Sequence, residues 1–119
     1  MSLRVQQENI YFTETTTNLG ASATYTGPSR SVGTGPGEQG RYAAFNAFAT
    51  SAQAGTLRID MSADGTNWYR AAADAAVAAN AAVTLSVPVV QRFYRVVYVN
   101  GAGAQSGTAF MVASSFTAA

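Results

Sequence analysis

The sequence TLRIDMSADGTNWYR, residues 56–70, decides the fold class. Leu57, Ile59 and Met61 alternate with polar residues, which is the period-two pattern of a strand that buries one face. The alternation breaks at Asp64-Gly65, a dipeptide typical of tight turns because glycine tolerates positive φ. It resumes as a short aromatic strand. The stretch therefore predicts a β-hairpin.

The rest of the chain carries similar strand signals. Alternation or enrichment in β-branched and aromatic residues predicts strands at residues 4–12, 23–27, 41–49, 83–88, 92–99 and 108–116. Residues 92–99 are apolar on both faces apart from their arginines, so we expect them at the centre of a sheet. The alanine-rich residues 71–82 are interpreted as a loop or an edge strand, with a helical turn as the alternative. Seven or eight short strands predict an all-β fold, an antiparallel β-sandwich of jelly-roll or Greek-key type.

The first forty residues differ from the rest. Residues 27–40 are rich in glycine and proline and predict a long loop. We therefore divide the chain into an N-terminal strand or arm with its loop, residues 1–40, and a β-sandwich domain, residues 41–119. Ile10, Tyr11 and Phe12 are the candidate contacts of such an arm with a neighbouring molecule. The alternative is that this strand completes its own sandwich.

Composition excludes several classes of function. The chain has 119 residues, a formal net charge of +1, only 11% charged residues, and no cysteine or histidine. This balance gives no electrostatic footprint for nucleic acid or for an anionic membrane surface. No apolar run reaches the about 18 residues that a membrane-spanning helix needs. Disulfides, Cys/His metal sites and Ser-His triads are also excluded.

Catalytic candidates are weak. A glycosidase-like pair of carboxylates would have to come from Asp60, Asp64, Asp74, Glu8, Glu14 and Glu38. Asp64 lies in the tight turn, where aspartate usually caps its own backbone, and Asp60 is expected to point outward, opposite arginines. We expect no catalytic, cofactor-binding or metal site, and we expect that the protein is not an enzyme.

Trp68 and Tyr69 are candidate ligand-stacking residues. Aromatic faces on a β-sandwich commonly bind sugars, and these two lie side by side in the sequence. The alternative, which we favour for Trp68, is that one of the two packs into the core. Their exposure in the structure distinguishes the two.

The C-terminal half resembles a β-sandwich module of tailed-bacteriophage virion proteins. The resemblance rests on the hairpin at residues 55–68, with its Ser-x-Asp-Gly-x-x-Trp sequence, and on residues 87–101 with Phe93-Tyr94-Arg95-Val96 and Asn100-Gly101, followed by an apolar final strand. It covers residues 55–119, roughly half of the chain. Such modules occur in capsid decoration (cement) proteins, head fibres and tail accessory proteins.

The resemblance implies a structural role in the virion. The expected function is a capsid decoration protein that binds and stabilises the outer head surface, made in the bacterial host cytoplasm. The major capsid protein is the expected partner, and a homo-oligomer, with a trimer favoured, is the expected assembly. The alternative is a carbohydrate- or receptor-binding module of a phage tail or fibre.

Overall fold

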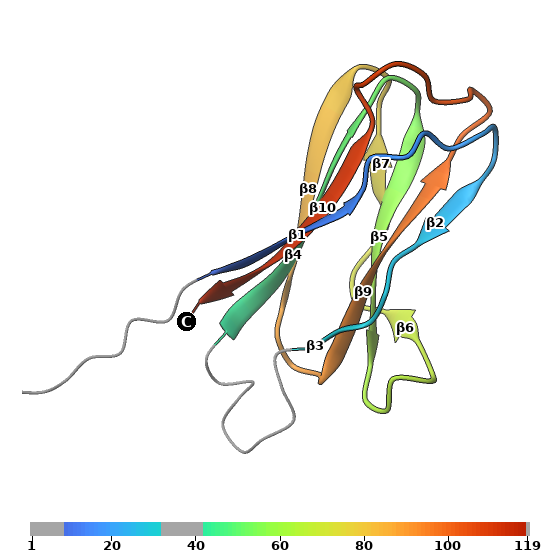
Figure 1. The fold of residues 1–119 in the computed structure, drawn as a ribbon. Helices are drawn as coiled ribbons and strands as arrows, with labels where there is room; N and C mark the ends of the chain where they lie inside the picture. The colour runs from blue at the N-terminus through green and yellow to red at the C-terminus, as the bar shows by residue number, and fades with distance from the viewer. Residues whose placement is uncertain (1–8, 32–41, 119) are drawn as a thin grey trace, which may run out of the picture.

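The computed structural model describes residues 9–31 and 42–118, in which ten strands form two antiparallel sheets and no helix is present (Figure 1). The predicted all-β antiparallel sandwich is thus confirmed. Its jelly-roll or Greek-key topology stays a prediction. The N-terminal part of the predicted strand 4–12 and most of the predicted loop 27–40 lie outside the described residues. No segment of the described chain is a helix long and apolar enough to cross a membrane.

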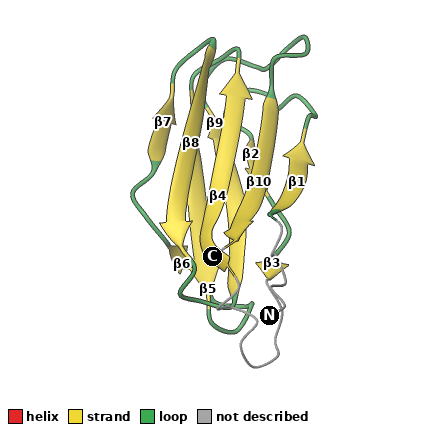
Figure 2. Cartoon of the chain, turned by 90° about the vertical axis from the view of Figure 1, so that its left-hand side faces the viewer, coloured by secondary structure: helices red, strands yellow, loops and turns green. Residues whose placement is uncertain are grey.

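The first sheet has the strand order β1-β10-β4-β8 (Figure 2). Its strands are β1 (Ile10–Thr15), β10 (Met111–Ala118), β4 (Tyr42–Ser51) and β8 (Ala81–Pro88). The second sheet has the order β2-β9-β5-β6, with β3 also on β9 and β7 also on β5. Its strands are β2 (Thr24–Thr26), β9 (Phe93–Asn100), β5 (Gly55–Ser62), β6 (Tyr69–Arg70), β3 (Arg30–Ser31) and β7 (Ala75–Val77).

The hairpin that decided the fold class is present. β5 pairs with β6 through Asp60 opposite Arg70 and Met61 opposite Tyr69, and Gly65 in the connecting turn has a φ of +79°. β9 pairs with β5 on one side and with β2 and β3 on the other. The predicted central position of residues 92–99 is therefore confirmed.

Aromatic residues fill the space between the sheets. Phe45 of β4 stacks on Tyr94 of β9 at a centroid distance of 5.2 Å, and Phe116 of β10 contacts both rings. All three are fully buried. Burial of a large apolar side chain contributes about 1.5–3 kcal/mol to the free energy of folding, so this cluster stabilises the packing of one sheet on the other.

Two short strands, β3 and β7, raise the total to ten, above the predicted seven or eight. One of them, β3, lies inside the predicted loop 27–40, so the prediction that this whole segment lacks regular structure was wrong at Arg30 and Ser31. The physical reason is tertiary: Arg30 is held by an ion pair to Glu14 and lies beside the edge of β9. The alanine-rich residues 71–82 contain the edge strand β7 and the first residues of β8, which agrees with the favoured interpretation.

Residues of the first forty positions belong to both sheets. β1 pairs with β10, while β2 and β3 pair with β9 (Figure 1). For Ile10–Thr15 the structure therefore realises the alternative in which the strand completes its own sandwich.

Candidate functional site

A carboxylate between two arginines lies on the outer face of the second sheet. Asp60 is only 3% exposed, its Oδ1 lies 2.9 Å from Arg58 Nε, and its Oδ2 lies 3.0 Å from Arg95 Nε. Leu57 and Ile59 point into the core, so the alternating residues Arg58 and Asp60 point outward, as predicted. Both carboxylate oxygens face a guanidinium, which makes Asp60 an ion-pair partner and not a free acid or base.

The candidate stacking residues lie beside this ion pair. The Arg95 guanidinium carbon is 4.5 Å from the Trp68 ring centroid, a cation–π contact that occupies one face of the indole. Trp68 is only half-buried and is not part of the core between the sheets. Tyr69 is 66% exposed and pairs with Met61, which packs against the core side of the sheet. Trp68, just before β6, thus contacts Arg95 on the outer face, whereas Tyr69 lies opposite Met61, so the two rings form no continuous platform. Ligand stacking by either residue stays a prediction.

Asp64 stabilises the turn in which it lies through hydrogen bonds to its own backbone neighbours. Its Oδ1 accepts hydrogen bonds of 2.9 Å from the backbone N–H groups of Thr66 and Asn67, and its Oδ2 accepts one of 2.8 Å from the Asn67 amide. These bonds, those from Asn67 first, hold the pKa of Asp64 far below its ordinary value. The predicted capping role is confirmed.

The other acidic candidates have different surroundings. Asp74 forms an exposed ion pair with Arg70 (3.3 Å), and Glu14 lies between the sheets, whereas Glu8 and Glu38 are outside the described residues. Over residues 9–31 and 42–118 no cluster of three or more acidic side chains could hold a metal ion. Each of the described carboxylates Glu14, Asp60, Asp64 and Asp74 is held by an ion pair or hydrogen bonds of its own.

Glu14, one of the candidate carboxylates, has a buried ion-pair role that sequence reasoning missed. Its side chain is fully buried and receives a bidentate ion pair from Arg30, with Nε–Oε2 at 3.0 Å and Nη2–Oε1 at 3.1 Å. Ser114 Oγ donates to Oε2 at 2.6 Å and the Tyr25 hydroxyl donates to Oε1 at 3.2 Å. Glu14 follows Ile10 and Phe12 on the inward side of β1, and the pairing register with β10 shifts between Thr13 and Thr15. Four strands, β1, β2, β3 and β10, thus meet at one carboxylate.

The three candidate arm contacts divide by strand alternation. Ile10 and Phe12 pack against the core, and Phe12 also carries the Arg30 guanidinium at 4.0 Å from its ring centroid. Tyr11 points away and is 74% exposed. Of the three, Tyr11 is therefore the side chain that remains free to contact another molecule, a role that stays a prediction.

The outer face of the first sheet bears no charge. In its four strands Glu14 is the sole ionised side chain, and it points inward. The outward positions are held by hydroxyl, amide, alanine and larger apolar side chains. They include Asn46 and Phe48 of β4, Ala113 and Ser115 of β10, and Thr84 and Ser86 of β8, matched by the strand register. We call this surface the neutral face.

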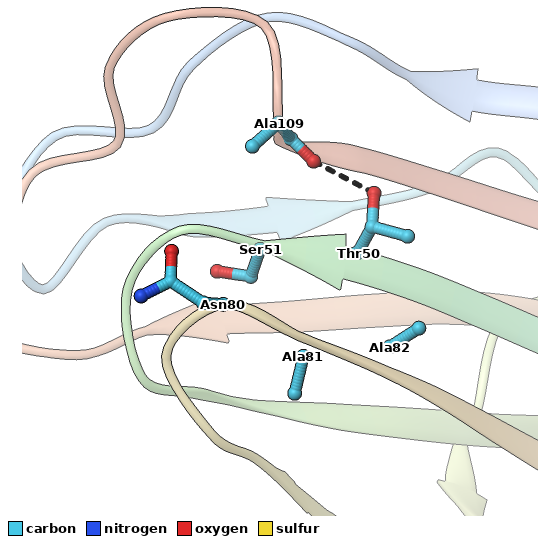
Figure 3. A pocket seen from close by; sticks show the side chains of 6 residues that line it. All are labelled: Thr50, Ser51, Asn80, Ala81, Ala82 and Ala109. Carbon is cyan, nitrogen blue, oxygen red and sulfur yellow. Dashed lines mark hydrogen bonds between the residues drawn. The ribbon is translucent and has the colours of Figure 1, made fainter.

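A shallow depression of about 410 Å³ lies at one end of the sandwich (Figure 3). Thr50, Ser51, Asn80, Ala81, Ala82 and Ala109 line it. The Thr50 hydroxyl donates to the Ala109 carbonyl at 2.7 Å, and the Ser51 hydroxyl accepts a hydrogen bond from the buried Gln105 amide at 2.6 Å. With no ionisable lining group and both hydroxyls in hydrogen bonds, the depression offers neither a base nor an activated nucleophile.

Fold and surfaces together define an antiparallel β-sandwich domain with one charged and one neutral sheet face. The family model described as the N-terminal domain of uncharacterised protein YqxG matches residues 2–117. The chain belongs to this family.

Among solved structures, the crystal structure of the PBSX exported protein XepA is similar to this chain. The TM-score is 0.78 and the sequence identity 26%, over 92% of this chain and 37% of XepA. The chain thus spans little more than a third of the length of XepA. A search of curated proteins finds no match.

Two weaker likenesses are to a protein of the disulfide-linked pili of Bacillus endospore appendages and to the Tobacco streak virus coat protein. The pilus protein has a TM-score of 0.46 and 12% identity, over 100% of this chain and 98% of its own. The coat protein has a TM-score of 0.48 and 8% identity, over 98% of this chain and 90% of its own.

Proposed function

We propose that this protein is a structural component of a phage particle, and specifically a capsid decoration protein on the outer head surface. The observation that carries the proposal is the likeness to the PBSX phage exported protein XepA, which extends over nearly the whole of this chain. The resemblance of residues 55–119 to virion β-sandwich modules points to the same class.

The neutral face supplies the physical support. A protein that binds a repeating lattice needs a contact surface whose desolvation is inexpensive, and uncharged side chains are desolvated at far lower free energy than ionised ones. The neutral face covers four strands, and its centre carries Phe48 opposite Ala113. We assign this face to the contact with the major capsid protein and the charged face of the second sheet to the solvent.

A homo-oligomer is part of the proposal. Decoration proteins of this kind occupy three-fold positions, so a trimer on the capsid is the assembly that the resemblance implies. A trimer would then bind the capsid through three linked contacts, with a higher avidity than a single subunit.

The alternative, a carbohydrate-binding module of a tail or fibre, has one observation in its favour, the 66% exposure of Tyr69. Against it stands the Trp68 ring, which already stacks on Arg95. Glycan-array binding at micromolar affinity that disappears in Trp68→Ala would favour this alternative.

Co-sedimentation with empty, expanded capsids of the phage that encodes this chain tests the proposal. The wild-type protein should sediment with the capsids, and Ala113→Arg, which places a cation at the centre of the neutral face, should reduce the bound fraction at least tenfold. Thr24→Arg is the matched control, since Thr24 is exposed on the other sheet. Absence of wild-type binding, or equal loss in both variants, would overturn the proposal.

A further inference from the structure

The outer edge of β8 is the longest unprotected strand edge in the described structure. β8 forms one border of the first sheet and pairs only with β4 among the described strands (Figure 2). Eight residues, Ala81–Pro88, run along this border. β7 leads into β8 through the turn at Asn80, but its own pairing is with β5 in the second sheet. The peptide groups on the far side of β8 therefore lack a strand partner within the described chain.

The other edges carry the features by which proteins prevent edge-to-edge pairing. β1, the opposite border of the same sheet, has a bulge between Thr13 and Thr15 and an inward-pointing charge, Glu14. The border strands of the second sheet are only two or three residues long: β2, β3, β6 and β7. Short strands, bulges and inward charges all disfavour the addition of a further strand.

β8 has none of these features before its last residue. Ala81–Val87 contains no charge, no proline and no register shift against β4, and only Pro88 closes the strand. Val83 and Leu85 point toward the core yet remain partly exposed. A strand added at this edge would bury both side chains and pair the free peptide groups.

We propose that the edge of β8 binds β8 of a second copy of this chain, antiparallel about a two-fold axis, so that the two first sheets become one. Two observations favour a second copy as the occupant. A two-fold contact brings each group near its own equivalent, and the neutral face and β8 contain no charge that would be repelled. In addition, β8 alternates apolar inward and small or hydroxyl outward residues from end to end, so its pattern matches its own reverse.

The pleat limits the register. Residues directly opposite each other lie on the same face of a sheet, so the pairing must place inward residues of one copy opposite inward residues of the other. Two registers, each of which pairs seven of the eight residues of β8, satisfy this condition. In one, Thr84 lies opposite Thr84; in the other, Leu85 lies opposite Leu85 and Thr84 opposite Ser86.

The contact joins two copies and stands independently of any role in a virion. A trimer would have to use other surfaces. Light scattering across a concentration series should therefore give a mass that rises from 12.3 kDa to twice that value. Thr84→Lys, which sets two ammonium groups against each other at the contact, should weaken dimerisation at least tenfold. Thr13→Lys, exposed on the opposite border of the same sheet, should leave it unchanged.

Single cysteines give a second measurement, since these 119 residues contain none. On mild oxidation, either Thr84→Cys alone or a mixture of Thr84→Cys and Ser86→Cys should form a covalent dimer, because directly paired strand residues meet the disulfide distance. Thr13→Cys should stay monomeric. A wild-type protein that remains at 12.3 kDa at millimolar concentration, failure of both cysteine combinations to cross-link, or equal cross-linking of Thr13→Cys would overturn the proposal.

Discussion

Glu14 and Arg30 form a bidentate ion pair in which the carboxylate is wholly buried and the guanidinium side chain is 21% exposed. The pair joins a border strand of the first sheet to a border strand of the second. At this side of the sandwich an ion pair and hydrogen bonds hold the two sheets together, whereas at the centre aromatic packing does so.

Removing one member of this pair should destabilise the fold far more than removing both. Arg30→Met leaves a buried carboxylate without its cation and should lower the free energy of unfolding by about 3 kcal/mol, whereas Glu14→Gln with Arg30→Met should restore at least half of the loss. Urea unfolding of the wild type, both single variants and the double variant measures this coupling. Additive single effects would contradict it.

Tyr25 should make stability sensitive to alkaline pH. Burial, the negative charge of Glu14 and the hydrogen bond to it raise the pKa of Tyr25 to about 12, against an opposing effect of Arg30. Since the folded-state pKa is above the unfolded value of about 10, the stabilisation is complete below pH 10 and is lost as pH rises toward 12. Tyr25→Phe should therefore show a shallower decline of the urea midpoint over this interval. Parallel declines would exclude Tyr25 as the cause.

Two Asp–Arg pairs on the second sheet should differ sharply in their contribution to stability. Asp60→Asn leaves Arg58 and Arg95 facing a neutral group and should destabilise the fold by about 2 kcal/mol, because this carboxylate is nearly buried. Asp74→Asn breaks the exposed pair with Arg70 and should change stability by less than about 1 kcal/mol. Thermal melts of both variants decide the matter; equal effects would contradict the burial argument.

Gly55 should tolerate no side chain. A Cβ at this position would lie 2.8 Å from Cε1 of Tyr98 and closer still to its hydroxyl, and that ring is fully buried against Phe110. Gly55→Ala should cost about 1–3 kcal/mol or more through overpacking. Gly20→Ala is the control, since nothing lies within 4 Å of a Cβ there, and it should be neutral within about 0.5 kcal/mol. Differential scanning calorimetry of the pair measures the difference.

The strands that alternate strictly were predictable from the sequence. Leu57, Ile59 and Met61 define the buried face of β5 by themselves, and Asp64-Gly65 marks the turn because its chemistry is local. The position of Asp60 opposite arginines followed from the same alternation. In these places local pattern and tertiary structure agree.

The features that sequence could not predict depend on contacts between distant residues. Glu14 shares the inward side of β1 with Ile10 and Phe12, but the ion pair that accommodates its buried charge comes from Arg30, which the sequence does not place beside it. β3 forms because Arg30 reaches that carboxylate, against the loop preference of its glycine- and proline-rich surroundings. Trp68 stacks on Arg95 instead of entering the core, which depends on the pairing of β5 with β9. The neutral face appeared only when four separate strands were placed side by side.

The pairing of β1 with β10 also sets the order in which the molecule can form during its synthesis. β2 and β3 cannot pair until β9 has been synthesised, and β1 cannot pair until β10 has been synthesised, because each partner lies far along the sequence. At about 5–20 residues per second, the ribosome needs on the order of several seconds to add the segment between Ser31 and Phe93. Throughout that interval the first three strands lack their partners, and the sandwich can close only after β9 and β10 have been synthesised. A chain truncated before residue 93 should therefore remain protease-sensitive at residues 9–31, and one that extends beyond residue 118 should be resistant there.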